Sequence, residues 1–575
     1  MSGKITLPGL SQFSSLVDTN HVATDEQVSE INTLLGPHLQ SLKSLEGELD
    51  KIGKIWADLS RQHASLLAEV NTVREIIAPM RRVPTDILQE IFRHCLPTKY
   101  NAIMSAEHCP LLLTRVCRSW RNIALATPSL WASLHIPVPS IPSKYFYGQY
   151  AFQDDQGEVT VAEAVGRRVT GMQEWLARSG TCALSLSLSE EDAGGFPRPE
   201  FIIPVFLSFS SRWKDLVVSA PLDRLSSLAA AVSDVPLLES LTLMRERHSR
   251  SSFHVEADSS IMWDTMDLLK APRLRKVSFE RLWRVPPPLP LRWSQLTSFT
   301  FKERYREISS TDGFPILTVA RMLQPCVHLT DLHLEFCSHF NDLQPLSDEA
   351  EELRPPFMLS LPLIERLFIH DGGNDTRRMT IFFNALQAPS LRFLDISASP
   401  PLSFFSRTPR LGYLHLHLDQ FTQDSLIQLL RHCQQLTSLV TSRSAIHWGA
   451  EEIPQSHIFD DNVLNLFVSP VDGDESSYFC PELEELECRS CAGFSDEGMV
   501  DFITRKRDGS VPGVAKLKRL HVAFDRTRRS WTGEQNERFV QDGLQLFVSH
   551  LDRDPIPQPT FPAVAGIRNY ISWGQ

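Results

Sequence analysis

The chain has 575 residues, of which 42% are hydrophobic and 22% are charged, and its formal net charge is -12. This length exceeds that of one compact domain, and the composition is typical of a globular protein with a large core. The acidic balance argues against a nucleic-acid-binding protein, which would present a basic surface. Because no run of about 18 consecutive apolar residues occurs, we expect no membrane-spanning helix and no membrane partner.

The first residues contain no apolar segment of the kind found in signal peptides. Ten cysteines in a chain of this length are too few for a disulfide-stabilised scaffold. We therefore expect reduced thiols and a cytoplasmic or nuclear location.

Residues 1–25 show no periodic pattern, and we expect them to be disordered. Residues 26–79 carry a heptad repeat, which predicts a coiled-coil-like helix. The a positions are Val28, Leu35, Leu42, Leu49, Trp56, His63, Val70 and Ile77. The d positions are Ile31, His38, Leu45, Ile52, Leu59, Leu66 and Val73.

Gly36-Pro37 interrupts this repeat, and proline removes a helical hydrogen-bond donor. We therefore expect the continuous helix to begin near Pro37 and to end at Pro79. Its apolar seam predicts either self-association through residues 38–77 or packing onto another part of this chain, and the sequence leaves both open.

Residues 80–136 carry two apolar stripes at helical spacing, which predict a small helical bundle. Pro84-Thr85-Asp86 has the composition of a helix start. The first stripe is Ile87, Leu88, Ile91, Phe92 and Cys95, and the second is Leu113, Val116, Cys117, Trp120, Ile123 and Ala124. A helical turn at Pro128–Trp131 and an extended segment at Ser133–Ile136 follow.

Residues 137–180 are predicted to be a linker, with a polar loop at Gly148–Gly157 and a helix around Val161–Arg178. At the other end of the chain, residues 553–575 form a proline-rich tail.

Between residues 181 and 552 the pattern L-x-x-L-x-L recurs, with other apolar residues allowed at each leucine position. The copies are Ala183/Leu186/Leu188, Trp213/Leu216/Val218, Leu238/Leu241/Leu243, Leu274/Val277/Phe279, Leu296/Phe299/Phe301, Leu329/Leu332/Leu334, Ile364/Leu367/Ile369, Leu391/Leu394/Ile396, Leu411/Leu414/Leu416, Leu436/Leu439, Leu483/Leu486/Cys488 and Leu517/Leu520/Val522.

Each such unit supplies a short strand and returns through a helix or loop, and neighbouring units stack to share one core. Spacings between copies range from 20 residues (Leu391 to Leu411) to 47 (Leu436 to Leu483). We therefore predict an α/β fold: a long N-terminal helix, a small helical bundle, and an irregular leucine-rich-repeat solenoid shaped like a horseshoe. The longest insertion, 441–482, contains an acidic turn at 472–475 and is expected to be mobile.

Two copies share a cysteine pattern, with Cys326 and Cys337 in one and Cys480 and Cys491 in the other. This pattern resembles the cysteine-containing subclass of leucine-rich repeats, the type that is often attached to F-boxes.

Residues 81–136 resemble the F-box-like domain of mushroom-type (basidiomycete) fungi. The matching residues are Val83, Pro84, Ile87, Leu88, Ile91, Phe92, Val116, Cys117, Arg118, Trp120, Arg121, Ile123, Ala124, Pro128, Leu130 and Trp131. The resemblance implies that the F-box binds a Skp-type adaptor of a cullin–RING ubiquitin ligase while the repeats hold an unknown protein substrate. It also implies that Pro84, Leu88, Ile91, Phe92, Val116 and Trp120 face or support that adaptor.

The residues between the leucines of each strand point away from the core, because side chains alternate along a strand. Three consecutive copies place unusual side chains there: Arg366, Phe368, His370, Phe393, Asp395, Tyr413, His415 and His417. Aromatic and arginine residues are enriched at binding hot spots. We predict that these residues form a partner-binding concave face, or else that a long loop covers them.

No nucleotide-binding, hydrolase or metalloprotease motif occurs, so we predict a non-enzymatic chain with no cofactor and no bound metal. Cys480, Cys488 and Cys491 could bind zinc, but the repeat explains them as core thiols. His415-x-His417-x-Asp419 could bind a metal from one strand face, but a partner contact is the favoured interpretation. Pro286–Pro288 indicates a stiff loop. A scaffold with no ubiquitin link is the alternative to the ligase adaptor.

Overall fold

The computed structural model describes residues 7–138, 155–190, 202–245, 266–282, 289–302, 316–336, 357–371, 376–443, 458–470, 478–489, 492–524 and 533–550, apart from isolated positions and very short gaps within these ranges. The chain divides into two compact units, Met1–Leu88 and Gln89–Gln575. The predicted sites at Cys337, Cys491, Pro286–Pro288 and residues 472–475, and the tail 553–575, lie outside the described residues.

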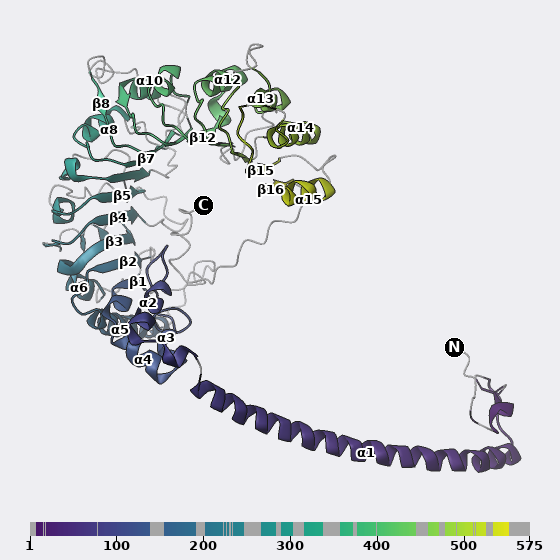
Figure 1. Ribbon diagram of the computed structural model, residues 1–575. Helices are drawn as coiled ribbons and strands as arrows, with labels where there is room; N and C mark the ends of the chain where they lie inside the picture. Colours follow the sequence, from purple (N-terminus) through teal and green to yellow (C-terminus); the bar gives the residue numbers. More distant parts are fainter. Residues whose placement is uncertain are drawn as a thin grey trace. The chain divides into compact units, whose positions relative to one another are not determined.

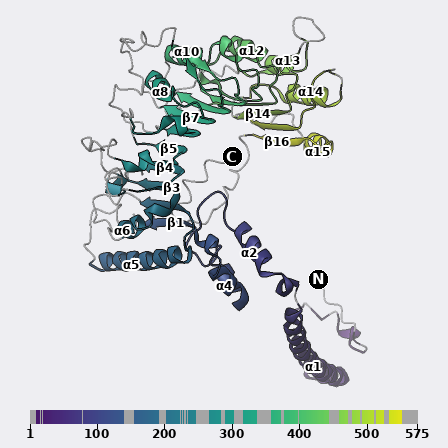
Figure 2. The same ribbon diagram turned by 60° about the vertical axis from the view of Figure 1, so that its left-hand side comes forward.

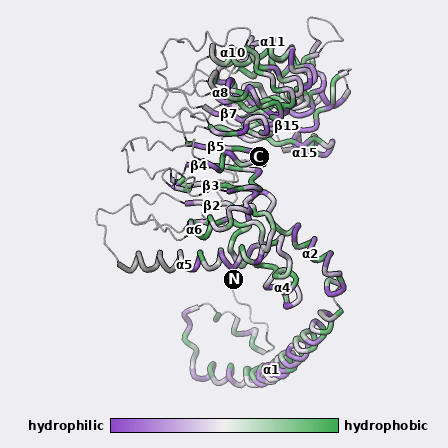
Figure 3. The backbone as a smooth tube through the Cα atoms, turned by 90° about the vertical axis from the view of Figure 1, so that its left-hand side faces the viewer, coloured by the Kyte–Doolittle hydropathy of each residue, from purple (hydrophilic) through white to green (hydrophobic). Residues whose placement is uncertain are grey.

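The first unit consists mainly of helix α1, Asp25–Ile76. The predicted start near Pro37 is wrong, since the helix runs through this proline without a break. A proline removes only one backbone donor, and helix-forming sequence on both sides continues past it. Apolar and polar residues alternate along α1 (Figure 3). A 3-10 helix, η1 (Ser11–Phe13), lies in the segment 1–25 that we expected to be disordered.

Short helices follow: η2 (Pro79–Arg82), α2 (Thr85–His94), α3 (Leu113–Val116), α4 (Arg118–Leu125) and η3 (Pro128–Trp131). The Phe92 ring on α2 is fully buried and lies 4.8 Å from the Trp120 ring on α4. Trp131 is also fully buried, and its indole Nε1 donates a hydrogen bond of 2.9 Å to the carbonyl of Ala124. Aromatic side chains therefore hold these helices together.

The second unit is built on one parallel sheet, in which the described residues form fourteen strands. Its strands follow one another in chain order, and only β8 and β10 of the described strands lie outside it, so β9 comes directly after β7 and β11 directly after β9. Figure 2 shows β1, β3, β4, β5 and β7 following one another in this order along the sheet. The strands are β1 (Ser133–Val138), β2 (Leu184–Glu190), β3 (Trp213–Ala220), β4 (Ser240–Arg245), β5 (Lys276–Glu280), β6 (Ser298–Lys302), β7 (Asp331–Phe336), β9 (Arg366–Asp371), β11 (Phe393–Ile396), β12 (Tyr413–His417), β13 (Ser438–Ser442), β14 (Glu485–Arg489), β15 (Arg519–Ala523) and β16 (Gln545–Ser549).

Helices connect the strands and follow the outer side of the sheet in Figure 1. They are α5 (Asp155–Arg178), α6 (Ile202–Leu207), α8 (Ile316–Leu323), α10 (Thr376–Ala385), α11 (Leu402–Phe405), α12 (Gln423–Arg431), α13 (Asp461–Leu466), α14 (Asp496–Arg507) and α15 (Gly533–Gln541). A separate two-stranded sheet pairs β8 (Leu359–Ser360) with β10 (Leu386–Gln387). None of the helices described combines the length and apolar character that crossing a bilayer requires.

The register of the sheet aligns the leucines of successive repeats. Leu367 pairs with Leu394, Leu394 with Leu414, and Leu414 with Leu439, and all four side chains are fully buried. The fold is therefore a mixed α/β structure with a long N-terminal helix and a large parallel sheet, as predicted at this level.

Three predicted boundaries need correction. The sheet begins at β1 rather than at residue 181, because Leu134 and Ile136 of the expected helical zone pair with Leu186 and Leu188. Helix α5 begins at Asp155, inside the predicted polar loop. Helix α13 lies within the insertion 441–482 that we expected to be mobile.

Candidate functional site

The predicted concave-face residues lie on three neighbouring strands, β9, β11 and β12. We call the sheet surface that carries them the inner face. Phe393 pairs in register with Arg366 on one side and with Tyr413 on the other, and Asp395 pairs with Phe368 and His415. All eight predicted residues are therefore brought together. Arg366 also donates a hydrogen bond from its Nε to Oδ1 of Asp331 on β7.

The aromatic rings of the inner face form a continuous row, in which the outer pairs are stacked and the middle pair is tilted. Phe393 and Tyr413 are stacked with centroids 4.0 Å apart, and Phe368 lies 4.7 Å from Phe393. His333 extends the row onto β7, stacked 4.8 Å from Phe368. The three predicted rings are half-buried rather than freely exposed, because they cover one another. Burial raises the pKa of Tyr413 to about 12, and the Asp395 carboxylate adds to this shift.

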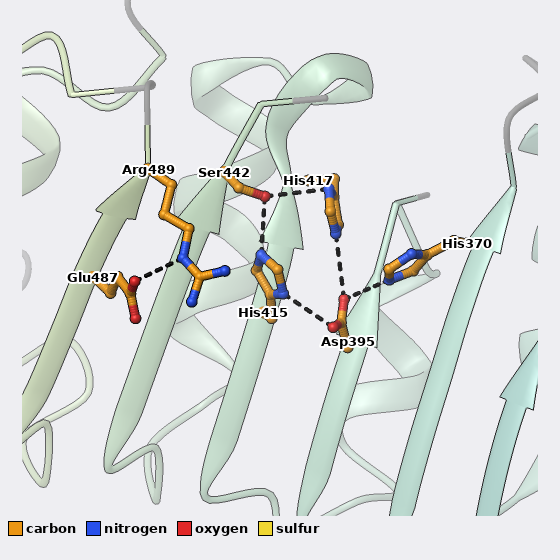
Figure 4. A network of polar contacts seen from close by, with 7 residues as sticks. All are labelled: His370, Asp395, His415, His417, Ser442, Glu487 and Arg489. Atoms are coloured by element: carbon orange, nitrogen blue, oxygen red, sulfur yellow. Dashed lines mark hydrogen bonds and ion pairs between the residues drawn. The ribbon is translucent and has the colours of Figure 1, made fainter. Parts of the chain in front are cut away.

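Beside this row, Asp395 stands at the centre of a histidine cluster (Figure 4). Its Oδ1 accepts a hydrogen bond of 2.6 Å from Nε2 of His370, and its Oδ2 lies 3.0 Å from Nδ1 of His415. The Nε2 atom of His417 lies 3.4 Å from Oδ1. Burial acts to raise the pKa of Asp395, but its contacts with the three histidines outweigh burial and hold that pKa well below its usual range. Asp395 is therefore a carboxylate.

Ser442 on β13 joins two of the histidines, since its Oγ lies 2.9 Å from Nε2 of His415 and 3.2 Å from Nδ1 of His417. His415 and Asp395 are buried, while His370 and His417 are partly open to the inner face. Burial lowers the pKa of His417, an effect that the Asp395 contact opposes only in part.

The predicted grouping of His415, His417 and Asp419 is wrong. Strand β12 ends at His417, and Asp419 is an exposed residue of the 3-10 helix η9 (Leu418–Gln420). Side chains alternate only while the strand continues, so the carboxylate that meets these histidines is Asp395, from the neighbouring strand.

We did not predict that Ser442, His333, Glu487 and Arg489 belong to this surface. The sequence signal is positional: His333 and Glu487 lie between the last two core positions of their repeats, and Ser442 and Arg489 directly follow the last one. Arg489 Nε donates a hydrogen bond of 2.6 Å to Oε1 of Glu487, and His521 Nδ1 lies 2.9 Å from the same oxygen. The inner face thus continues past β12 as a row of paired charges.

The six predicted adaptor-facing residues differ in their exposure. Leu88 and Phe92 are buried and Trp120 is half-buried, whereas Pro84, Ile91 and Val116 are exposed. Leu88 and Phe92 therefore belong to a core, where they can support a surface but cannot form it.

The cysteines of the repeats are buried, as core thiols would be. Cys326, Cys433, Cys480 and Cys488 all lie in the interior. Burial raises the pKa of Cys326 and Cys433 to about 12, so both are neutral thiols at pH 7.

We compared the chain with models of known protein families and with curated proteins, and neither comparison found a match.

Proposed function

We propose that this chain is a non-catalytic adaptor whose short helices dock a Skp-type subunit of a cullin–RING ubiquitin ligase and whose inner face binds a protein substrate. Docking of the adaptor is supported by the exposure of apolar side chains on and beside α2 and α3. Ile91 is 38% exposed, Leu112 is 42% exposed and Val116 is 56% exposed.

These side chains extend from helices that already have a core. Phe92, next to Ile91, is fully buried against Trp120, and Leu113, next to Leu112, is also buried. The exposed residues are therefore not needed to hold the helices together. Exposed apolar side chains that a helix core does not need are candidates for protein interaction, and Ile91 and Val116 are among the residues that the F-box resemblance assigns to the adaptor.

The parallel sheet supports the second half of the proposal. Each predicted L-x-x-L-x-L copy supplies one strand, which is the arrangement expected of a leucine-rich-repeat solenoid. In such solenoids the extended concave surface is the usual binding surface. The part of the inner face best suited to anchor a partner is the aromatic row of His333, Phe368, Phe393 and Tyr413.

The second candidate function is a scaffold without a ubiquitin link. The exposed apolar seam of helix α1 supports this candidate. Its seam residues are strongly exposed, with Leu49 at 67% and Trp56 at 73%. Such a seam is suited to joining two copies of the chain.

Binding of the purified full-length chain to a purified Skp-type adaptor separates the two candidates. We expect Val116→Asp to weaken this binding by about tenfold or more, because it places a charge in an apolar interface at a cost of about 1.4 kcal/mol or more. Val540→Asp is the matched control, since Val540 is 47% exposed on α15, far along the chain. Failure of the unmodified chain to bind the adaptor would leave the scaffold as the better account.

A further inference from the structure

When all three histidines of the Asp395 cluster are neutral, hydrogen-bond counting leaves one of its contacts without a proton. A carboxylate only accepts hydrogen bonds, so Nε2 of His370 and Nδ1 of His415 must both carry protons to bond Asp395. A neutral His415 then has a bare Nε2, which takes the single hydroxyl proton of Ser442.

Ser442 Oγ has no second proton to give, so it accepts its other hydrogen bond from Nδ1 of His417. The Nε2 of a neutral His417 is then a bare lone pair that lies 3.4 Å from Oδ1 of Asp395. This nitrogen is buried and makes no hydrogen bond. Two lone pairs thus face each other in this arrangement, and either a proton on one of the histidine rings or a bound cation would remove that contact.

A metal ion placed between these atoms would accept both lone pairs, and a third from His370 once the proton of that ring lies on its other nitrogen. His370, Asp395 and His417 each offer one ligand atom, and these atoms all lie within 4.8 Å of one another. Zinc binds imidazole nitrogen and carboxylate oxygen at roughly 2.0–2.2 Å, which puts neighbouring ligands of a tetrahedral site roughly 3.4 Å apart. The contact between His417 and Asp395 already has this separation, and the shorter one between His370 and Asp395 needs a small opening.

The surrounding residues hold these ligands as the outer shell of a metal site does. Metal-bound histidines and carboxylates usually have their remaining polar atoms fixed by hydrogen bonds. His415 fixes the second oxygen of Asp395, and Ser442 fixes the second nitrogen of His417. Because strands β9, β11 and β12 are hydrogen-bonded to one another, the three ligands lie on a rigid support.

The site opens onto the inner face of the sheet. The His370 side chain is 26% exposed and the His417 side chain is 20% exposed, while Asp395 lies deeper at 11%. Three protein ligands with one open position form the type of zinc site that keeps a water or an exchangeable ligand. Two imidazoles and one carboxylate also suit iron(II). We favour zinc(II) because its filled d shell gives it no redox chemistry, so the site needs no electron donor or acceptor.

We propose that His370, Asp395 and His417 bind one divalent transition-metal ion, zinc by preference, with an open coordination position on the inner face. The site lies on the same inner face as the proposed substrate surface, but metal binding there can be measured without an adaptor or a substrate.

Zinc binding by the untagged full-length chain, freed of metal with a chelator, tests the proposal. We expect one zinc ion per chain, and we expect His417→Gln and Asp395→Asn each to weaken binding by more than about a hundredfold. Loss of an outer-shell partner costs roughly 10–100-fold, so His415→Gln should have an intermediate effect. His521→Gln, which changes a histidine on the same face three strands away, should bind zinc as the unmodified chain does.

Two further measurements guard against misfolding and against binding by cysteines. Zinc should raise the melting temperature of the unmodified chain, because it binds only the folded state, and should not raise that of His417→Gln. Cobalt(II) bound in place of zinc should show no thiolate charge-transfer absorption. Absence of zinc binding, binding that survives His417→Gln, or thiolate absorption from the bound cobalt would each overturn the site.

Discussion

Phe393 and Tyr413 lie face to face on adjacent strands, with ring centroids 4.0 Å apart and planes 8° from parallel. Phe368 continues this row on the next strand. If the row anchors a partner, changing Phe368, Phe393 and Tyr413 together to serine should abolish partner recovery. It should also lower stability, because each stacked pair is worth about 0.5–1.5 kcal/mol beyond its buried area. Partner recovery and melting temperature are measured on the same samples.

Phe547→Ser provides the control for this triple change. Phe547 is 60% exposed and pairs in register with His521 on the same inner face, at the far end of the sheet. We expect it to leave partner recovery unchanged. A triple variant that binds normally and melts normally would exclude the aromatic row as the site.

The short helices should depend on Phe92. This ring is fully buried against Trp120, so Phe92→Ala should cost roughly 3–5 kcal/mol. Because a chain of two units does not unfold in one step, the effect is best followed by amide hydrogen exchange in α4. Exchange there should accelerate strongly in Phe92→Ala and stay nearly unchanged in Val116→Ala, whose side chain is exposed. Equal exchange in the two variants would mean that the assigned core is wrong.

Helix α1 should mediate self-association through its seam. Leu59 and Leu66 are 56% and 61% exposed at seam positions, so changing both to aspartate should convert a dimer to a monomer in sedimentation of the full-length chain. The matched control changes Ala57 and Ala64, which lie off the seam, to aspartate. A monomeric unmodified chain at high concentration would contradict self-association.

Because Lys506 is buried, we expect the free energy of unfolding of the chain to contain a contribution that rises at alkaline pH. The side chain is buried in α14, and its Nζ donates hydrogen bonds of 3.0 Å and 3.3 Å to the carbonyls of Leu483 and Ala515. Burial lowers its pKa from 10.5 to about 8. Between these values the unfolded chain binds more protons than the folded chain, so the free energy of unfolding rises with pH.

The full effect is roughly 3–4 kcal/mol, from about 1.4 kcal/mol for each unit between 10.5 and about 8. Relative to Lys506→Met, the unmodified chain should therefore gain stability as the pH rises from 7 to 10 in chemical denaturation. Comparison with this variant removes the effects of the other groups that titrate in the same range. A difference that stays constant with pH would show that Lys506 remains charged without penalty.

Much of the sheet could be predicted from sequence, because burial of leucines leaves a periodic signal. Each predicted copy forms a strand, but β16 was missed, and the extended segment Ser133–Ile136 was not recognised as the first strand of the sheet. Trp131, Leu134 and Ile136 fit the repeat but also fit the helical motif, while Gly543 replaces the first apolar residue before Leu546 and Val548.

The candidate metal site was less predictable. Periodicity placed His370, Asp395 and His417 on one face of their strands, but it does not give the distances between strands or the directions of the rings. Ser442, which orients His417, lies 25 residues further along the chain, in a repeat whose inner-face positions hold only the small side chains Ser438, Val440 and Ser442. Hydrogen-bond partners of this kind depend on register, and register becomes visible only in the folded sheet.

The most direct test of the account is quantitative affinity capture of three versions of the chain from cells: unmodified, Val116→Asp, and the Phe368/Phe393/Tyr413 serine variant. We predict that the unmodified chain recovers cullin and Skp-type subunits together with a substrate protein. Val116→Asp should lose the ligase subunits and keep the substrate, and the serine variant should do the reverse. Absence of ligase subunits from the unmodified chain, or their full recovery with Val116→Asp, would contradict the proposed adaptor function.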